Sequence, residues 1–166
     1  MTDGGVAEKA VPIIIFDVSG EIWGVRFEEI RELIDAKAIT AVPKTPPFVL
    51  GIISQRGNIV TIIDFACLTG KTVRTDVKES RIVRLQSDRM DIGFLIRSEL
   101  SAASVAATEI GGKVEMQKGA GGNPLPVRII DRPNGTRLCL LEKDALLDFF
   151  DREIRKWVRR EKADSG

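Results

Sequence analysis

The segment from residue 43 to residue 64, PKTPPFVLGIISQRGNIVTIID, decides how this chain folds. Two apolar runs within it, 48–53 and 59–63, flank a polar segment, and this pattern predicts a hairpin of two buried strands. The paired prolines ahead of the first run disfavour helix there. Gly57 gives the backbone the freedom that a tight turn requires. Arg56 is therefore expected at the exposed tip of the hairpin, between strands that must be buried.

The length and composition of the chain point to a soluble globular protein. Its 166 residues suffice for one domain or for two small subdomains that share a core, and 43% hydrophobic with 30% charged residues is an ordinary balance. The net charge of +1 gives no general attraction to nucleic acid. No apolar run approaches the roughly 20 residues that span a bilayer. Residues 1–11 lack the features of a signal peptide and are expected to form a disordered tail.

The residue types that are missing restrict the chemistry. The sequence contains no histidine, which excludes a histidine-based catalytic triad, a histidine-ligated zinc site and a phospho-accepting histidine. The carboxylates, lysines and serines show no catalytic or calcium-binding spacing, so no catalytic residue, metal site or cofactor is expected. Cys67 and Cys139 form no CxxC motif. Two buried free thiols in a reducing cytosol are favoured over a disulfide between them.

Apolar periodicity and turn residues predict a chain made mostly of strands. A short helix, or one helical turn, is expected over 28–34, because Ile30, Leu33 and Ile34 are at helical spacing. One further helical turn over 64–69 should end at Gly70, and a polar loop over 71–80 is interpreted as the boundary between two subdomains. Strands are expected over 13–18, 22–27, 37–42, 48–53, 59–63, 82–85, 91–97, 126–130 and 136–141, with weaker patterns at 100–108 and 113–116.

A weak internal repeat supports the division into two units. A shift of 69 residues places Gly93 on Gly24 and aligns three apolar residues of strand 82–85 with three of strand 13–18. In both copies an apolar strand, a polar turn and a strand with a central glycine follow one another. This order predicts two similar β-units in tandem, and a glycine inside a strand indicates a bulge or a close approach of another backbone.

The chain ends in a long amphipathic pattern. From Glu142 onward, apolar residues recur at helical spacing, and residues 142–166 are expected to form a helix with a basic polar face, followed by a tail. In the first interpretation, the helix packs on the β-units and its charged end is solvated. In the second, the basic end binds an acidic membrane surface or nucleic acid. Interspersed acidic residues favour the first interpretation.

Arg56 also has two interpretations. Exposed arginines in turns are common and mostly have no function. An arginine on a rigid turn beside aliphatic strands, however, has the composition of a protein-interface hot spot. The residues around the turn alone do not decide between the two.

Several motifs in their order resemble the CheW-like domain of bacterial chemotaxis. The matching segments are Trp23-Gly24-Val25-Arg26-Phe27, Glu29-Ile30-Arg31-Glu32-Leu33-Ile34, Val42-Pro43 and Pro47 through Asp64. The resemblance is specific from Ile13 to Gly70 and looser through 82–97 and 138–147. It covers most of the chain.

The resemblance implies a fold and a function. The implied fold is mainly β: two SH3-like five-stranded β-barrels that share a core, with a C-terminal helix. The implied function is that of a non-enzymatic adaptor, which links the cytoplasmic tips of methyl-accepting chemoreceptors to the regulatory domain of a CheA-type histidine kinase in cytoplasmic arrays. Neither nucleic acid nor membrane insertion is expected.

The resemblance also assigns roles to single residues. The receptor-facing determinant is the Arg56-Gly57 turn with its neighbours Gln55 and Asn58. The kinase-facing surface is assigned to Ile30, Glu32, Leu33 and Val42.

This chain departs from the family pattern at a few positions. Gln55 stands where an aliphatic residue usually precedes the Arg-Gly pair, and Thr61 replaces a common proline. In the second half, Ile96-Arg97-Ser98-Glu99-Leu100 stands where a Val-Asp-x-Val pattern is usual, so that a base, Arg97, replaces an acid. The first two departures lie in the predicted receptor contact, and the third lies on the predicted partner surface of the second unit.

Overall fold

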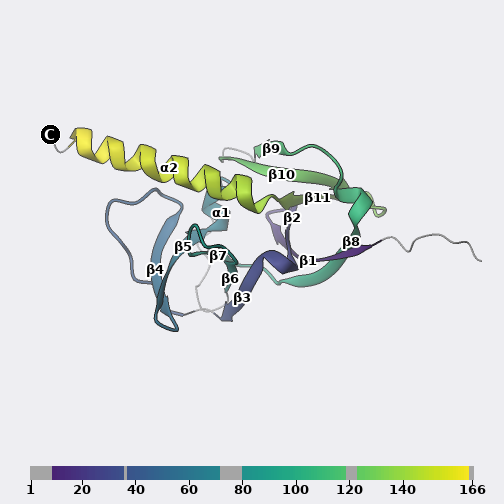
Figure 1. Ribbon diagram of the computed structural model, residues 1–166, viewed down its shortest axis with the longest axis horizontal. Helices are drawn as coiled ribbons and strands as arrows, with labels where there is room; N and C mark the ends of the chain where they lie inside the picture. The colour runs from purple at the N-terminus through teal and green to yellow at the C-terminus, as the bar shows by residue number, and fades with distance from the viewer. Residues whose placement is uncertain (1–8, 36, 72–79, 119–122, 165–166) are drawn as a thin grey trace, which may run out of the picture.

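A computed structural model describes residues 9–35, 37–71, 80–118 and 123–164. Eleven strands and one long helix account for most of this part of the chain (Figure 1). Their bounds are β1 Ala10–Val18, β2 Glu21–Arg26, β3 Ile30–Asp35, β4 Val49–Gln55, β5 Asn58–Asp64, β6 Arg81–Leu85, β7 Ile92–Ile96, β8 Ser101–Ala106, β9 Glu115–Lys118, β10 Pro124–Asp131 and β11 Arg137–Leu141. The helices are α1 Phe65–Leu68 and α2 Lys143–Asp164, with 3-10 turns η1 Phe27–Glu29 and η3 Ala107–Ile110.

The strands form two sheets. A six-stranded sheet has the order β8-β1-β2-β11-β10-β9, and a five-stranded sheet has the order β3-β6-β7-β5-β4. In each sheet the two edge strands follow one another in the chain, as in a barrel. Within the described residues, the edge strands do not pair along their length, and one bridge joins Thr40, after β3, to Ile52 of β4. The mainly β fold is confirmed, with six strands rather than five in one sheet.

The predicted boundary at residues 71–80 does not separate the sheets. β1 and β2 belong to the six-stranded sheet with β8–β11, whereas β3–β7 form the five-stranded sheet on their own. The five-stranded unit is therefore inserted into the six-stranded one, and the tandem order expected from the repeat is wrong. The physical reason is parallel pairing: β11 lies beside β2, and β7 beside β5. Residues 72–79 themselves lie outside the described residues.

The strand pairing in the structure agrees with the internal repeat. Ile15 pairs with Gly24 in one hairpin and Arg84 pairs with Gly93 in the other, as the shift of 69 residues requires. Both glycines allow a close approach of neighbouring side chains. A Cβ at Gly93 would lie 2.6 Å from Cγ2 of Ile82, and one at Gly24 would lie 3.1 Å from Cδ1 of Leu138.

The buried apolar residues of the described ranges form three clusters. One lies within each sheet, and the largest joins the two sheets, α1 and α2. Phe65 of α1 is at its centre and makes edge-to-face contacts with three rings, with centroid distances of 5.0 Å to Phe16, 5.2 Å to Trp23 and 5.4 Å to Phe94. Phe150 of α2 extends this group. A shared core, as expected, is therefore present.

Two local predictions between β2 and β4 are wrong. Residues 28–34 form the end of η1 and then strand β3, not a short helix, because pairing with β6 satisfies backbone groups that a helix of one or two turns would leave exposed. A β-bulge between Ile30 and Glu32 breaks the alternation of the strand and produces the apparent helical spacing. Residues 37–42 form no strand beyond the single bridge at Thr40.

The predicted N-terminal tail extends too far, whereas the cysteines are free as predicted. Residues 1–8 of the expected tail lie outside the described residues, while Ala10 and Val11 belong to β1. Both cysteines are free, as predicted; Cys139 is buried, whereas Cys67 is only partly so. Burial raises the pKa of the Cys139 thiol to about 11, so this thiol stays protonated near neutral pH.

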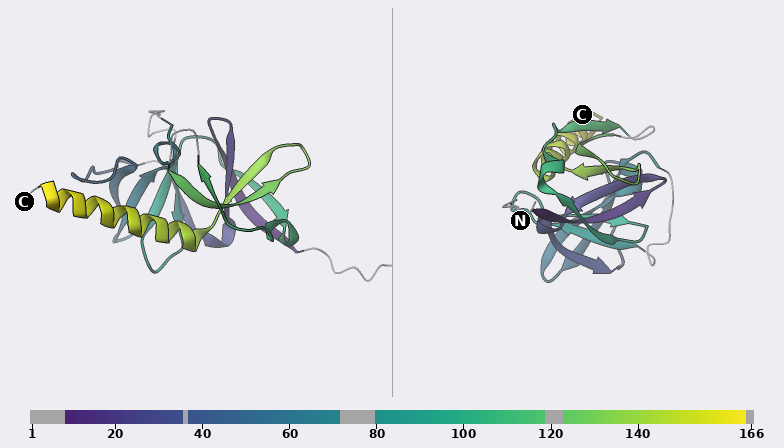
Figure 2. Two further views of the ribbon diagram at one scale, coloured as in Figure 1. Left: turned by 90° about the horizontal axis from the view of Figure 1, so that it is seen from above. Right: turned by 90° about the vertical axis from the view of Figure 1, so that its right-hand side faces the viewer.

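Helix α2 begins where the two sheets meet and runs along the flank of the five-stranded sheet (Figure 2). A group of charges fixes this beginning. Glu142 accepts hydrogen bonds from Arg26 at 2.9 Å and from Arg128 at 2.7 Å. Arg26 also forms an ion pair with Glu29, with 3.5 Å between Nη1 and Oε1. These contacts connect β2, η1 and β10 to the start of the helix. None of the helices in the described residues has the length and apolar character that a transmembrane span requires.

Glu29 gives a pH-dependent prediction. Burial raises its pKa to about 6 from 4.5, although Arg26 and Lys143 act in the opposite direction. Between these pH values the folded state therefore holds more protons than the unfolded state, and stability decreases as pH rises. Glu29→Gln removes this loss. Relative to the wild type, its free energy of unfolding should increase by about 2 kcal/mol between pH 4 and pH 7.

Urea unfolding of both proteins at several pH values measures this difference. Glu28→Gln is the matched control, because Glu28 is exposed in the same 3-10 turn. A difference between Glu29→Gln and wild type that does not change with pH would contradict the prediction.

Candidate interaction surface

The β4–β5 hairpin places Arg56 as the sequence predicts. Gln55 and Asn58 pair directly, so the turn consists of Arg56 and Gly57 alone. Both have positive φ angles, 51° and 82°, which is the two-residue turn whose twist matches that of the strands. A left-handed conformation costs a residue with a side chain about 1 kcal/mol, so the hairpin must hold Arg56 in place. Arg56, Gly57 and Asn58 are exposed.

The turn borders a shallow hollow on the molecular surface. Arg31 and Glu32 of β3, Arg56 and Asn58 of the hairpin, and Arg84 of β6 line it. Ile59, the next residue of β5, is 57% exposed beside the turn. The structure thus brings the predicted receptor-facing turn together with Glu32, one of the predicted kinase-facing residues, and adds exposed aliphatic surface next to the arginine.

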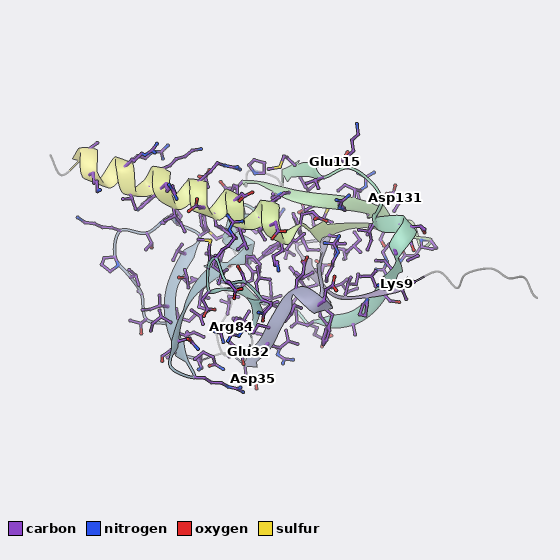
Figure 3. The ribbon with its side chains drawn as sticks, viewed as in Figure 1. Lys9, Glu32, Asp35, Arg84, Glu115 and Asp131 are labelled. Atoms are coloured by element: carbon purple, nitrogen blue, oxygen red, sulfur yellow. The ribbon has the colours of Figure 1, made fainter. Side chains whose placement is uncertain are left out.

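A buried arginine lies at the base of this hollow. Arg84 is 2% exposed and forms a two-pronged ion pair with Asp91, with distances of 2.8 Å from Nε to Oδ1 and 2.6 Å from Nη2 to Oδ2. Its Nη1 donates to Oε1 of Glu32 at 2.7 Å (Figure 3). A buried charge is tolerated only when it is paired and hydrogen-bonded, and Arg84 meets this condition.

The polar contacts continue from Glu32 to the hairpin. Nε2 of Gln55 donates to Oε2 of Glu32 at 3.3 Å, and Nζ of Lys37 donates to Oε1 of Gln55 at 2.5 Å. We call these five residues, Lys37, Gln55, Glu32, Arg84 and Asp91, the Arg84 network. The hydrogen bond from Arg84 is the main reason that the pKa of Glu32 lies below its ordinary value. Glu32 is therefore ionised at neutral pH.

Two departures from the family pattern take part in these contacts. Gln55 bonds to Glu32, which an aliphatic side chain could not do. The backbone N–H of Thr61 donates to the carbonyl oxygen of Asp91 at 2.9 Å, and a proline at this position would have no N–H to donate. Both departures therefore connect the hairpin to the Arg84 network.

The other predicted kinase-facing residues lie in different surroundings. Ile30 and Leu33 of β3 are partly buried and pack against the central cluster. Val42 is 37% exposed. The antiparallel bridge between Thr40 and Ile52 places it toward the start of β4, away from the turn.

The departure at Arg97 also has a structural explanation. Its Nη2 forms an ion pair with Oδ2 of Asp64 at 2.8 Å. The other oxygen of Asp64 accepts hydrogen bonds from the backbone N–H groups of Ala66 and Cys67 and so caps α1. The base at position 97 therefore holds the acid that begins α1, next to the central cluster.

The basic end of α2 is partly neutralised within the helix. Arg155 pairs with Asp151 at 3.2 Å, and Lys156 pairs with Glu153 at 3.3 Å. Nε1 of Trp157 donates to the carbonyl oxygen of Lys44 at 2.9 Å and ties the helix to the segment before β4. These contacts agree with a packed helix. Binding of a membrane or of nucleic acid stays an untested prediction.

Sequence reasoning missed Arg31, Lys37, Arg84 and Asp91. One signal could have found Arg84: a charged residue inside the apolar strand Ile82-Val83-Arg84-Leu85 must have a partner if it is buried. Asp91, just before the paired strand β7, is one of the two acids that follow Arg84 closely in sequence, the other being Asp88. Nothing local points to Glu32, which is far away in the chain.

Together, these features define a two-sheet β module with a shared aromatic core and an exposed arginine turn over a charged hollow. Comparison with known proteins assigns this module: the model of the CheW-like domain matches residues 12–149, and the chain belongs to this family.

Relatives and a solved structure agree with the assignment. The chain is 25% identical over 129 residues to the chemotaxis protein CheW of Helicobacter pylori, covering 78% of this chain and 71% of the relative. It is 26% identical over 147 residues to the probable chemotaxis protein CheW of Rhizobium etli, covering 85% and 90%. The crystal structure of the scaffolding protein TtCheW from Thermoanaerobacter tengcongensis has a similar fold, with a TM-score of 0.68 at 21% identity over 81% of this chain and 90% of that one.

Proposed function

We propose that this protein is a non-enzymatic adaptor of a chemotaxis system, which couples the cytoplasmic tips of chemoreceptors to a CheA-type histidine kinase at cytoplasmic receptor arrays. Membership of the CheW-like family and relatives named as chemotaxis proteins support the proposal. The observation that assigns this function to particular residues is the Arg56-Gly57 turn, which the hairpin fixes beside the exposed Ile59.

In this proposal, the turn residues Gln55, Arg56, Gly57 and Asn58 contact the receptor. Arginine next to exposed aliphatic surface is typical of interface hot spots, because the guanidinium combines a charge with a flat apolar face. The kinase is proposed to bind along β3 and the segment after it, where Glu32 and Val42 are accessible and Ile30 and Leu33 support the surface from below. Such a protein acts by holding two partners in a fixed relation, so that a change in one biases the other.

Arg56→Ala tests the proposal. Loss of the guanidinium should weaken binding to the receptor's cytoplasmic fragment by about tenfold, which corresponds to about 1.4 kcal/mol. Arg56→Glu should weaken it further, because it reverses the charge. Co-sedimentation with the receptor fragment and the CheA-type kinase of the same organism measures both effects, and circular dichroism checks that the fold is unchanged.

Arg137→Ala is the matched control. Arg137 is an exposed strand arginine of the six-stranded sheet and pairs with the exposed Asp131 at 3.3 Å. It should bind as the wild type does. Wild-type protein that does not co-sediment with receptor and kinase would overturn the proposed function, and equal binding by Arg56→Ala and wild type would overturn the role of the turn.

A further inference from the structure

Two exposed arginines face the hollow beside the turn. Arg31 projects from the edge strand β3 and Arg56 from the hairpin, and both line the hollow. Neither takes part in an ion pair or a hydrogen bond within the part of the chain that the structure describes. Two arginines that line one concave surface match a carboxylate, which arginine binds with paired N–H donors.

Among the described residues that line the hollow, one acidic side chain could occupy this position. Glu32 lines the same hollow, and the charge of Arg56 acts on it. Both of its oxygens are already engaged, however: Oε1 accepts from Arg84 at 2.7 Å and Oε2 from Gln55 at 3.3 Å. Glu32 is therefore held by Arg84 and Gln55, and no hydrogen bond or ion pair joins it to Arg56 within the part of the chain that the structure describes.

The groups that hold Glu32 are themselves fixed. The two-pronged pair with Asp91 locks the buried guanidinium of Arg84, and the backbone of Asp91 accepts from Thr61 on β5. Lys37 holds Gln55 from the other side at 2.5 Å. The Arg84 network thus connects β3, β4, β5 and β6 around one carboxylate. Removing a member would release Glu32 to turn toward Arg56, since an unpaired carboxylate seeks the nearest cation.

We propose that the hollow binds an acidic side chain of the partner protein between Arg31 and Arg56, and that Arg84 and Gln55 are positioning residues that keep Glu32 from neutralising Arg56. This inference rests on the proposed function, because the partner is taken to be the receptor tip. It adds the chemistry of the contact: the receptor supplies a carboxylate. It also gives the two hairpin departures a purpose, since Gln55 and Thr61 both stabilise the arrangement that leaves Arg56 available.

Variants of the positioning residues test the inference through a rescue. Gln55→Leu and Arg84→Met should each weaken binding to the receptor fragment, measured without kinase, by about the same factor as Arg56→Ala, which is about tenfold. Adding Glu32→Gln to Arg84→Met removes the competing carboxylate and should restore wild-type affinity. In Gln55→Leu the same addition should restore it only in part, because Gln55 also belongs to the proposed receptor contact. Because Glu32→Gln also removes a carboxylate that has lost its partner and so restores stability, affinities are compared at equal concentrations of folded protein, where a merely structural role leaves no loss to rescue. Arg31→Ala should weaken binding directly, and Glu32→Gln should not rescue it.

Side-chain NMR of 15N-labelled arginine provides a readout that does not depend on the receptor. The Arg56 Nε–H should exchange rapidly with water in the wild type and slowly in Arg84→Met and Gln55→Leu, where Glu32 pairs with it. Unchanged exchange in both variants, or single variants that bind like wild type while Arg56→Ala does not, would overturn the inference and leave the proposed function standing. If wild type does not bind the receptor, the acidic-partner inference fails with the proposed function, while the exchange data still decide whether the Arg84 network directs Glu32.

Discussion

Gly51→Ala should destabilise the protein more than any other substitution of similar size. Gly51 lies at the bulge where the register between β4 and β5 shifts, and its φ angle is +148°, a conformation that residues with side chains rarely adopt. A Cβ there would lie 2.7 Å from the carbonyl carbon of Thr40 and closer still to its oxygen. The clash is with backbone, so no side-chain rotation can relieve it.

The expected cost combines backbone strain with this clash. We expect the free energy of unfolding to fall by roughly 3–4 kcal/mol, and the melting temperature by about 10 °C. Thermal unfolding followed by circular dichroism measures both. Gly112→Ala is the control, because Gly112 is exposed, its φ is not positive, and a Cβ there would meet no atom within 4 Å. Equal melting temperatures for Gly51→Ala and wild type would show that the segment at Thr40 can move away from β4.

Phe65→Ala is also expected to lower the free energy of unfolding strongly. Phe65 is fully buried and contacts rings from both sheets, with centroids 5.0–5.4 Å away. Truncation removes these contacts and leaves a cavity where the two sheets meet α1. Substitutions of this kind cost about 3–5 kcal/mol. Because the same ring contacts both sheets, the substitution should lower the stability of both sheets together, and the protein should still unfold in a single transition.

Chemical denaturation followed by tryptophan fluorescence suits this measurement, since Trp23 lies 5.2 Å from Phe65. Phe27→Ala removes an identical ring that is 56% exposed, and should change stability by less than about 1 kcal/mol. If the two substitutions proved equally mild, the aromatic cluster could not be the main connection between the sheets.

The sequence predicts the hairpin around Arg56 well because the necessary information is local. Two apolar strands and a glycine in the turn determine the geometry within a few residues, and the structure adds only that Arg56 itself has a positive φ. The same holds for α2, whose apolar spacing marks its buried face, and for the repeat that pairs Ile15 with Gly24 and Arg84 with Gly93.

The predictions that failed depend on contacts between distant residues. Strand β3 resembles a helix because a bulge, which its pairing with β6 creates, spaces its apolar residues by three and four. The interleaving of the two units follows from parallel pairing, which leaves no turn signal in the sequence. Arg84 and Glu32 come from strands separated by two other strands in the chain, so the candidate site could be predicted only as far as the turn.

The parallel pairing of β2 with β11 has a consequence for how this protein forms during synthesis. The five strands of the inserted unit, from Ile30 to Ile96, leave the ribosome as one continuous piece and find all their partners among themselves. The hairpin of β1 and β2 is made first, yet one edge of β2 has no partner until β11 is complete. The oldest part of the nascent chain is thus among the last to be covered, and its exposed edge is where premature pairing between chains would begin.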